Sequence, residues 1–341
     1  LPIIQGGMGV GISLSGLASA VANEGGVGVI SCAGIGLIYP KFSNDYRTNS
    51  IMGLREEIRK ARAKTSGVIG VNIMVALSNF ADMVRTAIEE KADIIFSGAG
   101  LPLDLPSYLG EKSSTKLVPI VSSARAAHII CEKWKTNYNY LPDAIVVEGP
   151  KAGGHLGDKN TPIEDDTFSL ERLIPEVVAT ADRFAAQHAH PIPVIAAGGL
   201  YTGEDIYRIM SLGAAGVQMG SIFVTTTECD ASETFKKTYI ESSKEDIEII
   251  ASPVGMPGRA IGGEFLRKVK AGLTRPKRCP FHCIKTCDYT KSPYCIILAL
   301  YNAAKGNLSR GYAFAGANAY LSKKITSVKE TIESLKAGFQ A

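Results

Sequence analysis

The feature of this sequence that most constrains its fold is a repeated pattern, in which a short apolar run is followed by a helical segment. Eight such units occupy roughly the first 240 residues. The apolar runs are residues 3–7, 27–31, 69–74, 94–98, 117–122, 144–148, 194–198 and 216–221. The segments that follow them are residues 15–23, 53–63, 80–90, 105–109 (a short turn), 124–134, 170–187, 203–212 and 231–242. This alternation predicts an α/β fold.

The apolar runs are continuous rather than alternating, which indicates strands that are buried on both faces of a parallel sheet. Eight units of this size fit a closed (β/α)8 TIM barrel better than an open doubly wound sheet. The glycines between Gly6 and Gly11 lack the spacing and the acidic partner of a dinucleotide-binding fingerprint. We therefore predict an α/β TIM barrel over residues 1–245.

The rhythm changes after residue 245, where a stretch rich in glycine and proline begins. A cysteine cluster at residues 279–295 follows, then an apolar helix near residues 294–304 and an amphipathic helix near residues 327–337. We expect residues 246–341 to form a C-terminal helical, Cys-containing extension packed on the barrel.

Composition and charge exclude several classes of protein. The net charge of +4 is small and the basic residues are interleaved with acidic ones, which argues against a nucleic-acid partner. The sequence contains no run of about eighteen apolar residues, so it predicts no membrane span. The opening LPIIQGGMGV lacks the basic region of a signal peptide. The isolated Cys32, Cys131 and Cys229 are typical of a reducing compartment, so we expect a cytoplasmic protein.

The carboxyl ends of the predicted strands carry mainly small or polar residues, and this is where barrels of this type place their chemistry. These residues are Gly6, Gly7, Met8, Ser31, Cys32, Asn72, Ser97, Gly98, Ser122, Ser123, Glu148, Gly198, Gly199, Gly220 and Ser221. Glycines at the ends of the last two strands favour a phosphate held by backbone N–H groups, although they would also suit tight turns alone.

One histidine stands out at a strand end. The run VVEGPKAGGHLGD, residues 146–158, passes from an apolar strand into Gly153, Gly154 and His155. Glycines let a backbone approach a ligand closely, and an imidazole can move a proton near neutral pH. A lone loop histidine usually makes only a structural hydrogen bond, and we interpret His128, His188, His190 and His282 in that way.

Five motifs occur together and in order: PIIQGGMG, GVNIM, EGPKAGGHLG, PVIAAGG and GVQMGSIF. In this combination the sequence resembles the nitronate monooxygenase (2-nitropropane dioxygenase) family. Flavin-dependent enoyl-acyl carrier protein reductases share them. The resemblance covers the barrel up to about residue 260, and it implies a TIM barrel that holds FMN without a covalent bond.

Residue by residue, the resemblance implies the following FMN contacts. Gly6, Gly7 and Met8 would line the isoalloxazine ring, and Asn72 would hydrogen-bond it. Glu148 would lie near the ribityl chain or the ring, and Gly153 and Gly154 would pass close to the flavin. The phosphate would be bound by Gly198, Gly199, Gly220 and Ser221, with Gln218 and Met219 alongside. His155 would be the catalytic residue, as a base toward a nitroalkane carbon or as a group that positions the anionic nitronate.

The resemblance leaves other activities open, because reductases of enoyl thioesters carry a similar AGGH stretch and quinone reductases occur among these barrels. The run SPVGMPGRAI, residues 252–261, is similar to a reductase segment, and it suggests that Arg259 contacts a phosphate or carboxylate near the substrate entrance. A more distant alternative is a flavin-free barrel that binds a phosphorylated ligand or a protein. We expect a small-molecule substrate, a nitronate or an enoyl thioester, and leave a homodimer open.

Four cysteines cluster in the extension, and their role is independent of the resemblance. Cys279, Cys283, Cys287 and Cys295 have the spacing C-x3-C-x3-C-x7-C, which is not a standard ferredoxin or zinc-finger spacing. Thiolates suit both Zn²⁺ and iron–sulfur clusters, so a metal site is one interpretation. Free thiols on a helix, with the first three on one face, and two local disulfides are the others.

Overall fold

A computed structural model describes residues 2–40, 42–157 and 168–340. Asp158 and the polar loop after it lie outside these residues. Eight parallel strands form one sheet in the order β1-β9-β8-β6-β5-β4-β3-β2. The strands are β1 (Ile3–Gln5), β2 (Gly28–Ser31), β3 (Ile69–Met74), β4 (Ile94–Gly98), β5 (Lys116–Val121), β6 (Ile145–Glu148), β8 (Val194–Ala197) and β9 (Gly216–Met219). All eight predicted strands are confirmed, mostly within two residues.

The first and last strands of this order meet, so the sheet closes into a barrel. Ile4 bridges Val27 in parallel, just before β2, and the Gln5 N–H donates to the Val27 carbonyl at 2.9 Å. The buried Gln5 side chain extends the seam, because its Oε1 accepts from Val29 N at 3.0 Å and its Nε2 donates to Val29 O at 3.2 Å. A side chain thus supplies hydrogen bonds where the short β1 backbone ends, and the predicted TIM barrel is confirmed.

The apolar residues of the strands divide between two layers. One layer fills the inside of the barrel, and its members are Ile4, Val29, Phe96, Val118, Ala144, Val146, Ile195 and Ala197. Their chain neighbours, such as Ile3, Ile30 and Ile95, belong to the larger core between strands and helices. Both faces of each strand are therefore buried, which explains why the runs are continuous rather than alternating.

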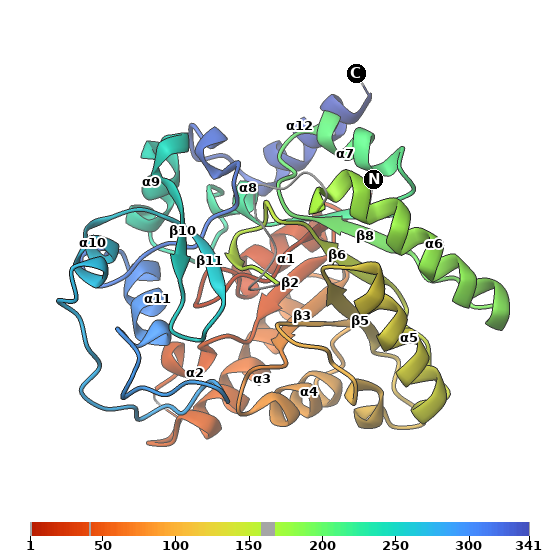
Figure 1. The fold of residues 1–341 in the computed structure, drawn as a ribbon, viewed down its shortest axis with the longest axis horizontal. Helices are drawn as coiled ribbons and strands as arrows, with labels where there is room; N and C mark the ends of the chain where they lie inside the picture. Colours follow the sequence, from red (N-terminus) through yellow and green to blue (C-terminus); the bar gives the residue numbers. More distant parts are fainter. Residues whose placement is uncertain (1, 41, 158–167, 341) are drawn as a thin grey trace.

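Helices surround the barrel, largely as the sequence predicts (Figure 1). They are α1 (Ser15–Asn23), α3 (Tyr46–Lys64), α4 (Phe80–Glu89), η1 (Leu105–Tyr108), α5 (Ala124–Tyr138), α6 (Leu170–His188), α7 (Gly203–Met210) and α9 (Glu233–Glu241). Helix α3 begins seven residues before the predicted start, because Asp45 caps it by accepting from Thr48 N at 2.8 Å. The short helices α2 (Ile35–Ile38) and α8 (Ser221–Val224) were not predicted.

A second, antiparallel sheet lies beside the barrel mouth, and the sequence did not predict it. Strands β10 (Ile247–Ala251) and β11 (Pro257–Ile261) form a hairpin, and β11 also pairs with β7 (Gly154–His155). Gly258 lies opposite His155 in this pairing. The sheet therefore holds the AGGH segment from the side of the C-terminal extension.

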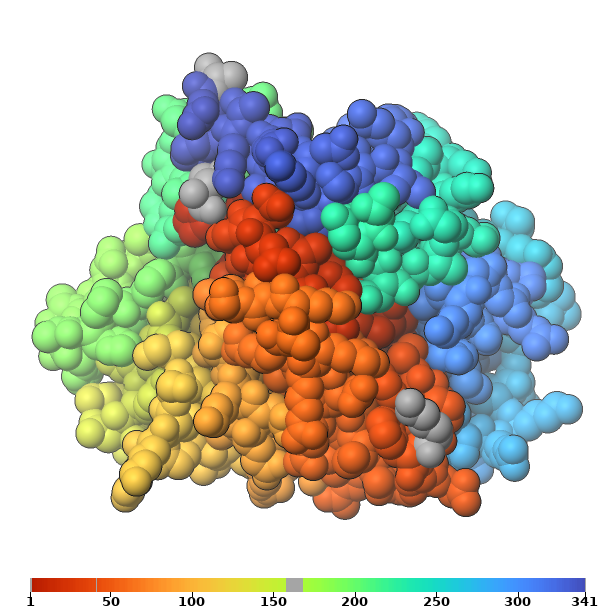
Figure 2. All heavy atoms as spheres, turned by 180° about the vertical axis from the view of Figure 1, so that it is seen from behind, coloured from red at the N-terminus to blue at the C-terminus, as the bar shows by residue number. Residues whose placement is uncertain are grey.

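The C-terminal residues pack against the barrel at two places. Helices α10 (Glu264–Lys270) and α11 (Ile296–Ala304) share an apolar cluster with β10 and β11, at the left of Figure 1. Helix α12 (Val328–Gln340) packs on α7, and the short helix η4 (Ala319–Leu321) precedes α12 in the chain. In the view from behind, C-terminal residues border the N-terminal helices (Figure 2). The division at residue 245 stays a proposal.

Residues 271–295 form turns and irregular backbone, and the structure describes all of them. The expectation that Cys279, Cys283 and Cys287 share one helical face is therefore wrong. Pro276, Pro280 and Pro293 fall within this stretch, and proline does not continue a helix. Among the described residues, we find no helix long and apolar enough to cross a membrane.

Candidate active site

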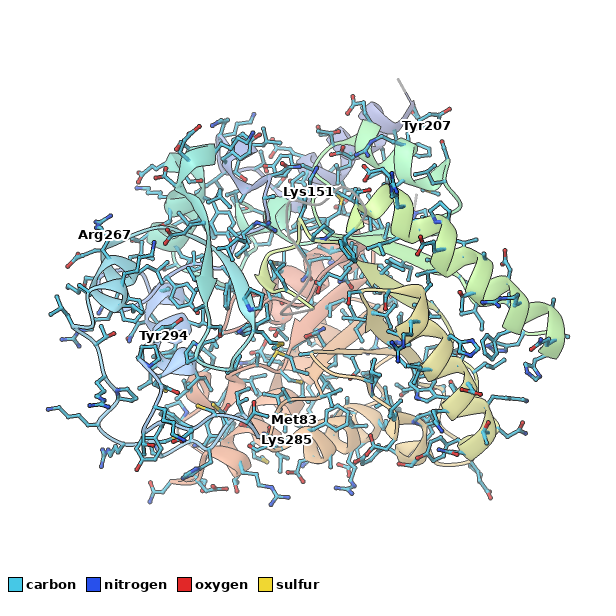
Figure 3. All side chains as sticks on the ribbon, viewed as in Figure 1. Met83, Lys151, Tyr207, Arg267, Lys285 and Tyr294 are labelled. Carbon is cyan, nitrogen blue, oxygen red and sulfur yellow. The ribbon has the colours of Figure 1, made fainter. Side chains whose placement is uncertain are left out.

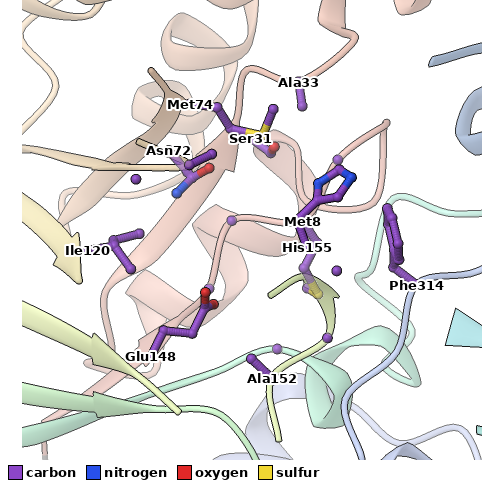
Figure 4. A pocket seen from close by; sticks show the side chains of 18 of the residues that line it. Met8, Ser31, Ala33, Asn72, Met74, Ile120, Glu148, Ala152, His155 and Phe314 are labelled. Carbon is purple, nitrogen blue, oxygen red and sulfur yellow. The ribbon is translucent and has the colours of Figure 1, made fainter. Parts of the chain in front are cut away.

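The barrel mouth opens into a cavity of about 560 Å³, and every residue predicted to bind FMN or catalyse lines it. The structure thus brings together Gly6, Gly7, Met8, Asn72, Glu148, Gly153, Gly154, His155, Gly198, Gly199, Gln218, Met219, Gly220 and Ser221. Figure 4 shows Asn72, Glu148 and His155 around this space, with Met8 between them. Their roles toward a ligand stay predictions.

Several positions of the cavity require glycine, and the physical reason differs from one to the next. Gly198 and Gly199 have φ of +99° and +81°, in the region that favours glycine, and a Cβ on Gly198 would stand 2.9 Å from Gly149 O. A Cβ on Gly153 would stand 2.6 Å from the backbone of Ala315. Turn geometry and packing therefore explain these three glycines without a ligand.

Gly6 and Gly220 are different, because neither conformation nor packing requires glycine there. A Cβ on Gly220 would meet only the Met8 side chain, from 3.4 Å, and the atoms nearest to one on Gly6 would be those of the Gln218 side chain, from 3.4 Å. Both contacts are ordinary van der Waals distances. The space beside these two residues belongs to the cavity, so a side chain would fill part of it. This is the cradle expected for a flat ligand that lies against backbone.

The ends of β8 and β9 could hold an anion through backbone and hydroxyl donors. Ser221 Oγ accepts from Gly316 N at 3.0 Å, which leaves the hydroxyl proton free to donate toward the cavity. Asn318 Nδ2 donates to Gly199 O at 2.7 Å and fixes the neighbouring turn. None of the described residues that line the cavity is lysine or arginine. A phosphate here would therefore depend on N–H and O–H groups.

His155 is held by three elements that the sequence does not place beside it. Its Nε2 lies 2.7 Å from Ser252 Oγ in the β10–β11 turn, and its ring contacts the edge of Phe314 at 5.1 Å between centroids. The backbone of β7 pairs with β11. Burial lowers the pKa of His155 to about 4. The imidazole is therefore neutral at pH 7, which suits a proton acceptor or a neutral donor better than a cation that holds an anion.

Glu148 is the only acidic residue among the described residues that line this cavity. It ends β6 and points into the same space as His155 (Figure 4). Burial raises the pKa of Glu148 to about 7. A carboxyl that keeps its proton up to neutral pH can donate a hydrogen bond as well as accept one. It can therefore contact either a hydroxyl or a carbonyl of a ligand.

Arg259 has a structural role that differs from the predicted one. Its guanidinium is buried, and Nη1 donates to Pro150 O at 2.6 Å and to Ala152 O at 2.9 Å. These carbonyls belong to the loop between Glu148 and His155. Arg259 therefore ties this loop to β11 and is not among the described residues that line the cavity, and burial also lowers its pKa.

The segment 312–318 is part of the site, and sequence reasoning missed it. Tyr312, Phe314, Gly316 and Asn318 line the cavity. Ala317 N donates to Lys151 O at 3.0 Å, which fastens the segment to the AGGH loop. The signal that could have revealed it is the run GYAFAGANAY, whose small residues permit close backbone approach.

The four clustered cysteines, all of which the structure describes, form no disulfide. All seven cysteines of the chain are described, and all are free thiols. Cys279, Cys283, Cys287 and Cys295 line a second, smaller cavity beside the first. Burial, together with the charges of the other three thiols, raises the pKa of Cys283 to about 12. The four cysteines that are close together in the sequence therefore also line one cavity.

Comparison with known proteins places this geometry in a family. A model of the nitronate monooxygenase family matches residues 1–93 and 78–338. A (3aS,4S,5R,7aS)-5-hydroxy-7a-methyl-1-oxo-octahydro-1H-indene-4-carboxyl-CoA dehydrogenase of Mycobacterium tuberculosis is 28% identical over 271 residues. This alignment covers 80% of the chain but 66% of that dehydrogenase. The chain therefore spans slightly less than two thirds of that relative's length.

Two further relatives cover more of their own length. A protein of Staphylococcus haemolyticus described as a probable nitronate monooxygenase is 27% identical over 306 residues, covering 79% of this chain and 77% of that protein. The solved structure of FabK from Thermotoga maritima superposes with a TM-score of 0.73 at 27% identity. That match covers 99% of this chain and 92% of FabK.

Proposed function

Because this chain belongs to the nitronate monooxygenase family of oxidoreductases, we propose that it holds FMN in the barrel cavity and oxidises alkyl nitronates or nitroalkanes with O₂. The observation that carries the proposal is the neutral His155, which faces a cavity with a ligand cradle at Gly6 and Gly220. We expect a cytoplasmic enzyme that acts on a small molecule.

The residues of the cavity fit FMN. The cradle at Gly6 and Gly220 suits a flat ring system, and Asn72 offers an amide that can both donate and accept. The turns after β8 and β9, with the Ser221 hydroxyl, suit a terminal phosphate. When bound, FMN would supply the electron transfer between substrate and O₂.

The chain's own part in the reaction is to bind, orient and deprotonate the substrate. With its Nε2 proton donated to Ser252, the His155 ring would present an unprotonated Nδ1 to a nitroalkane carbon. Because burial disfavours the imidazolium, taking up this proton would cost free energy, and the proton would leave His155 readily after transfer. A nitronate, which needs no deprotonation, would be positioned by His155 and the apolar residues around it, among them Phe314.

A second candidate is reduction or oxidation of an acyl thioester with a nicotinamide as partner, as in the enoyl-acyl carrier protein reductases. It is favoured by the 28% identity to a CoA-ester dehydrogenase and by the FabK neighbour. The cavity is also lined by apolar residues, among them Val254, Met256 and Ile297, and such a lining suits an acyl chain.

Identification of the bound cofactor and oxygen uptake test the proposal together. We expect heat-denatured protein to release FMN in about a one-to-one ratio, and propyl nitronate to stimulate oxygen consumption without a nicotinamide. Oxygen uptake or enoyl-thioester reduction that depends strictly on NADPH would favour the second candidate. A preparation that neither contains nor takes up a flavin would support the flavin-free alternative and reject both.

A further inference from the structure

The four cysteines of the extension surround a cavity of about 260 Å³, which we call the cysteine cavity. Cys279, Cys283, Cys287 and Cys295 all line it, although they span only residues 279–295. Cys283 is buried, and the other three are partly exposed at its rim. The proposed flavin chemistry uses none of these four thiols.

The cysteine cavity is built on the barrel and is not a loose loop. Ile284 bridges Leu77 in the loop after β3, with Ser78 N donating to Cys283 O at 3.1 Å and Lys285 N to Ala76 O at 3.0 Å. Lys285 Nζ, labelled in Figure 3, also donates to Val75 O at 2.9 Å and lies 5.5 Å from the centroid of the Phe80 ring of α4. The irregular cysteine segment is thus fixed at both its backbone and its side chains.

The surroundings of the cysteine cavity suit an anionic occupant. Arg278, His282 and Lys285 line it, whereas none of its described lining residues is aspartate or glutamate. The backbone N–H of His282 donates to Cys279 Sγ at 3.4 Å, as N–H groups do to the sulfur of a metal-bound cysteine. Cys295 directly precedes α11, so it lies at the N-terminus of that helix.

The size of the cysteine cavity leaves room for a cluster as well as for a single ion. A tetrahedral zinc with Zn–S of about 2.3 Å would hold its thiolates about 3.8 Å apart. Thiolates bound to different irons of one cluster stand farther apart. The cysteine cavity, at about 260 Å³ and lined by all four cysteines, offers room for the inorganic core.

We propose that Cys279, Cys283, Cys287 and Cys295 bind one [4Fe–4S] cluster, with one cysteine on each iron. Cys283, Ile284 and Ile296 line both the cysteine cavity and the barrel cavity, so one wall separates the cluster from the site that would hold flavin. Binding exchanges four thiol protons for iron. This site is independent of the flavin proposal.

Metal analysis of the whole chain tests this site directly. The protein is purified anaerobically, reconstituted with ferrous iron and sulfide, freed of excess reagents and assayed for iron, zinc and acid-labile sulfide. We expect about four iron and about four sulfide per chain, as the cluster formula requires, and an electron paramagnetic resonance signal after reduction with dithionite. We expect Cys279→Ser/Cys287→Ser to retain less than about one iron, because it removes two of the four ligands.

A matched control is Cys131→Ala, which removes a thiol buried in α5, away from the cysteine cavity. It should keep the iron and sulfide of the unaltered chain. Stoichiometric zinc with little iron in the unaltered chain would overturn the proposal. The same iron content in the double variant as in the unaltered chain would overturn it as well, by showing adventitious binding. Should the double variant fail to fold, the metal and sulfide content of the unaltered chain decides alone.

Discussion

At the scale of single residues, His155 and Glu148 share one cavity, and burial shifts their pKa values in opposite directions. The pKa of His155 falls to about 4 and that of Glu148 rises to about 7, so both groups are uncharged over much of the range between. A cavity with neutral side chains and no described lysine or arginine favours recognition by hydrogen bonds and shape.

Replacement of His155 tests its catalytic role. We expect His155→Gln to keep FMN and to lose about 10²- to 10⁴-fold in kcat, the usual contribution of a positioned acid or base. Ser252→Ala should lose only about fivefold, because it removes one hydrogen bond of about 1 kcal/mol, the 2.7 Å contact to Nε2. The assays are flavin content and steady-state oxygen uptake with a nitroalkane.

The matched control for His155 is His128→Gln on the exposed face of α5, which should change neither flavin content nor turnover. An unchanged kcat in His155→Gln would remove this residue from the mechanism.

Replacement of Glu148 tests its raised pKa through stability. In the flavin-free protein, the folded-state pKa of about 7 exceeds the ordinary 4.5. Well below pH 4.5 the carboxyl is neutral in both the folded and the unfolded state. As the pH rises to 7, the carboxyl ionises in the unfolded state but stays largely protonated in the folded state, so the unfolded state gains stability. The unfolding free energy of the unaltered chain, minus that of Glu148→Gln, should therefore fall by roughly 3 kcal/mol between pH 4.5 and 7.5.

Denaturant unfolding at several pH values gives this difference. The pair of proteins is needed because His155, whose pKa is lowered, makes stability rise with pH between about 4 and 6.5, and this cancels in the difference. A pH-independent difference would contradict the burial of an ionisable Glu148.

At the scale of secondary-structure elements, the turns after β8 and β9 are built from glycines with separate tasks. Gly198 and Gly199 are required by their positive φ, so their replacement would distort the turn itself. Gly220, with φ of −114°, can accept a side chain without that strain. It is therefore the better position at which to ask whether a ligand occupies the cradle.

We expect Gly220→Val to weaken FMN binding at least tenfold while the barrel stays folded, because its methyl groups would occupy cavity space beside Met8. Fluorescence titration with FMN measures the affinity, and circular dichroism checks the fold. Gly110→Val is the matched control, since Gly110 is exposed and a Cβ there meets nothing within 4 Å. Equal FMN affinity in the two variants would place the cofactor elsewhere.

The elements also show which parts of the site the sequence can reveal. Strand ends such as Asn72 and Glu148 were predicted, because parallel strands of a barrel bring their carboxyl ends to one face. The β10–β11 hairpin and Phe314 were not, because their contacts with His155 join segments about 100 or more residues apart. Arg259 was assigned to a ligand because sequence cannot show that nearby carbonyls already bind it.

At the scale of the whole molecule, the barrel and its extension enclose one cavity from opposite sides. The barrel supplies the glycine turns and Glu148, and the later segments supply Ser252, Phe314 and Asn318. The (β/α)8 fold follows from hydrophobic periodicity, which is local in sequence. The closure of the cavity follows from tertiary contacts, which join residues far apart in the sequence.

The proposed reaction is best tested by an anaerobic absorbance titration of the FMN-loaded chain, with propyl nitronate in one series and NADPH in the other. We expect propyl nitronate to remove the absorbance of oxidised flavin and NADPH to leave it unchanged. Loss of the absorbance with NADPH, and none with the nitronate, would refute nitronate oxidation and favour a nicotinamide-dependent reductase.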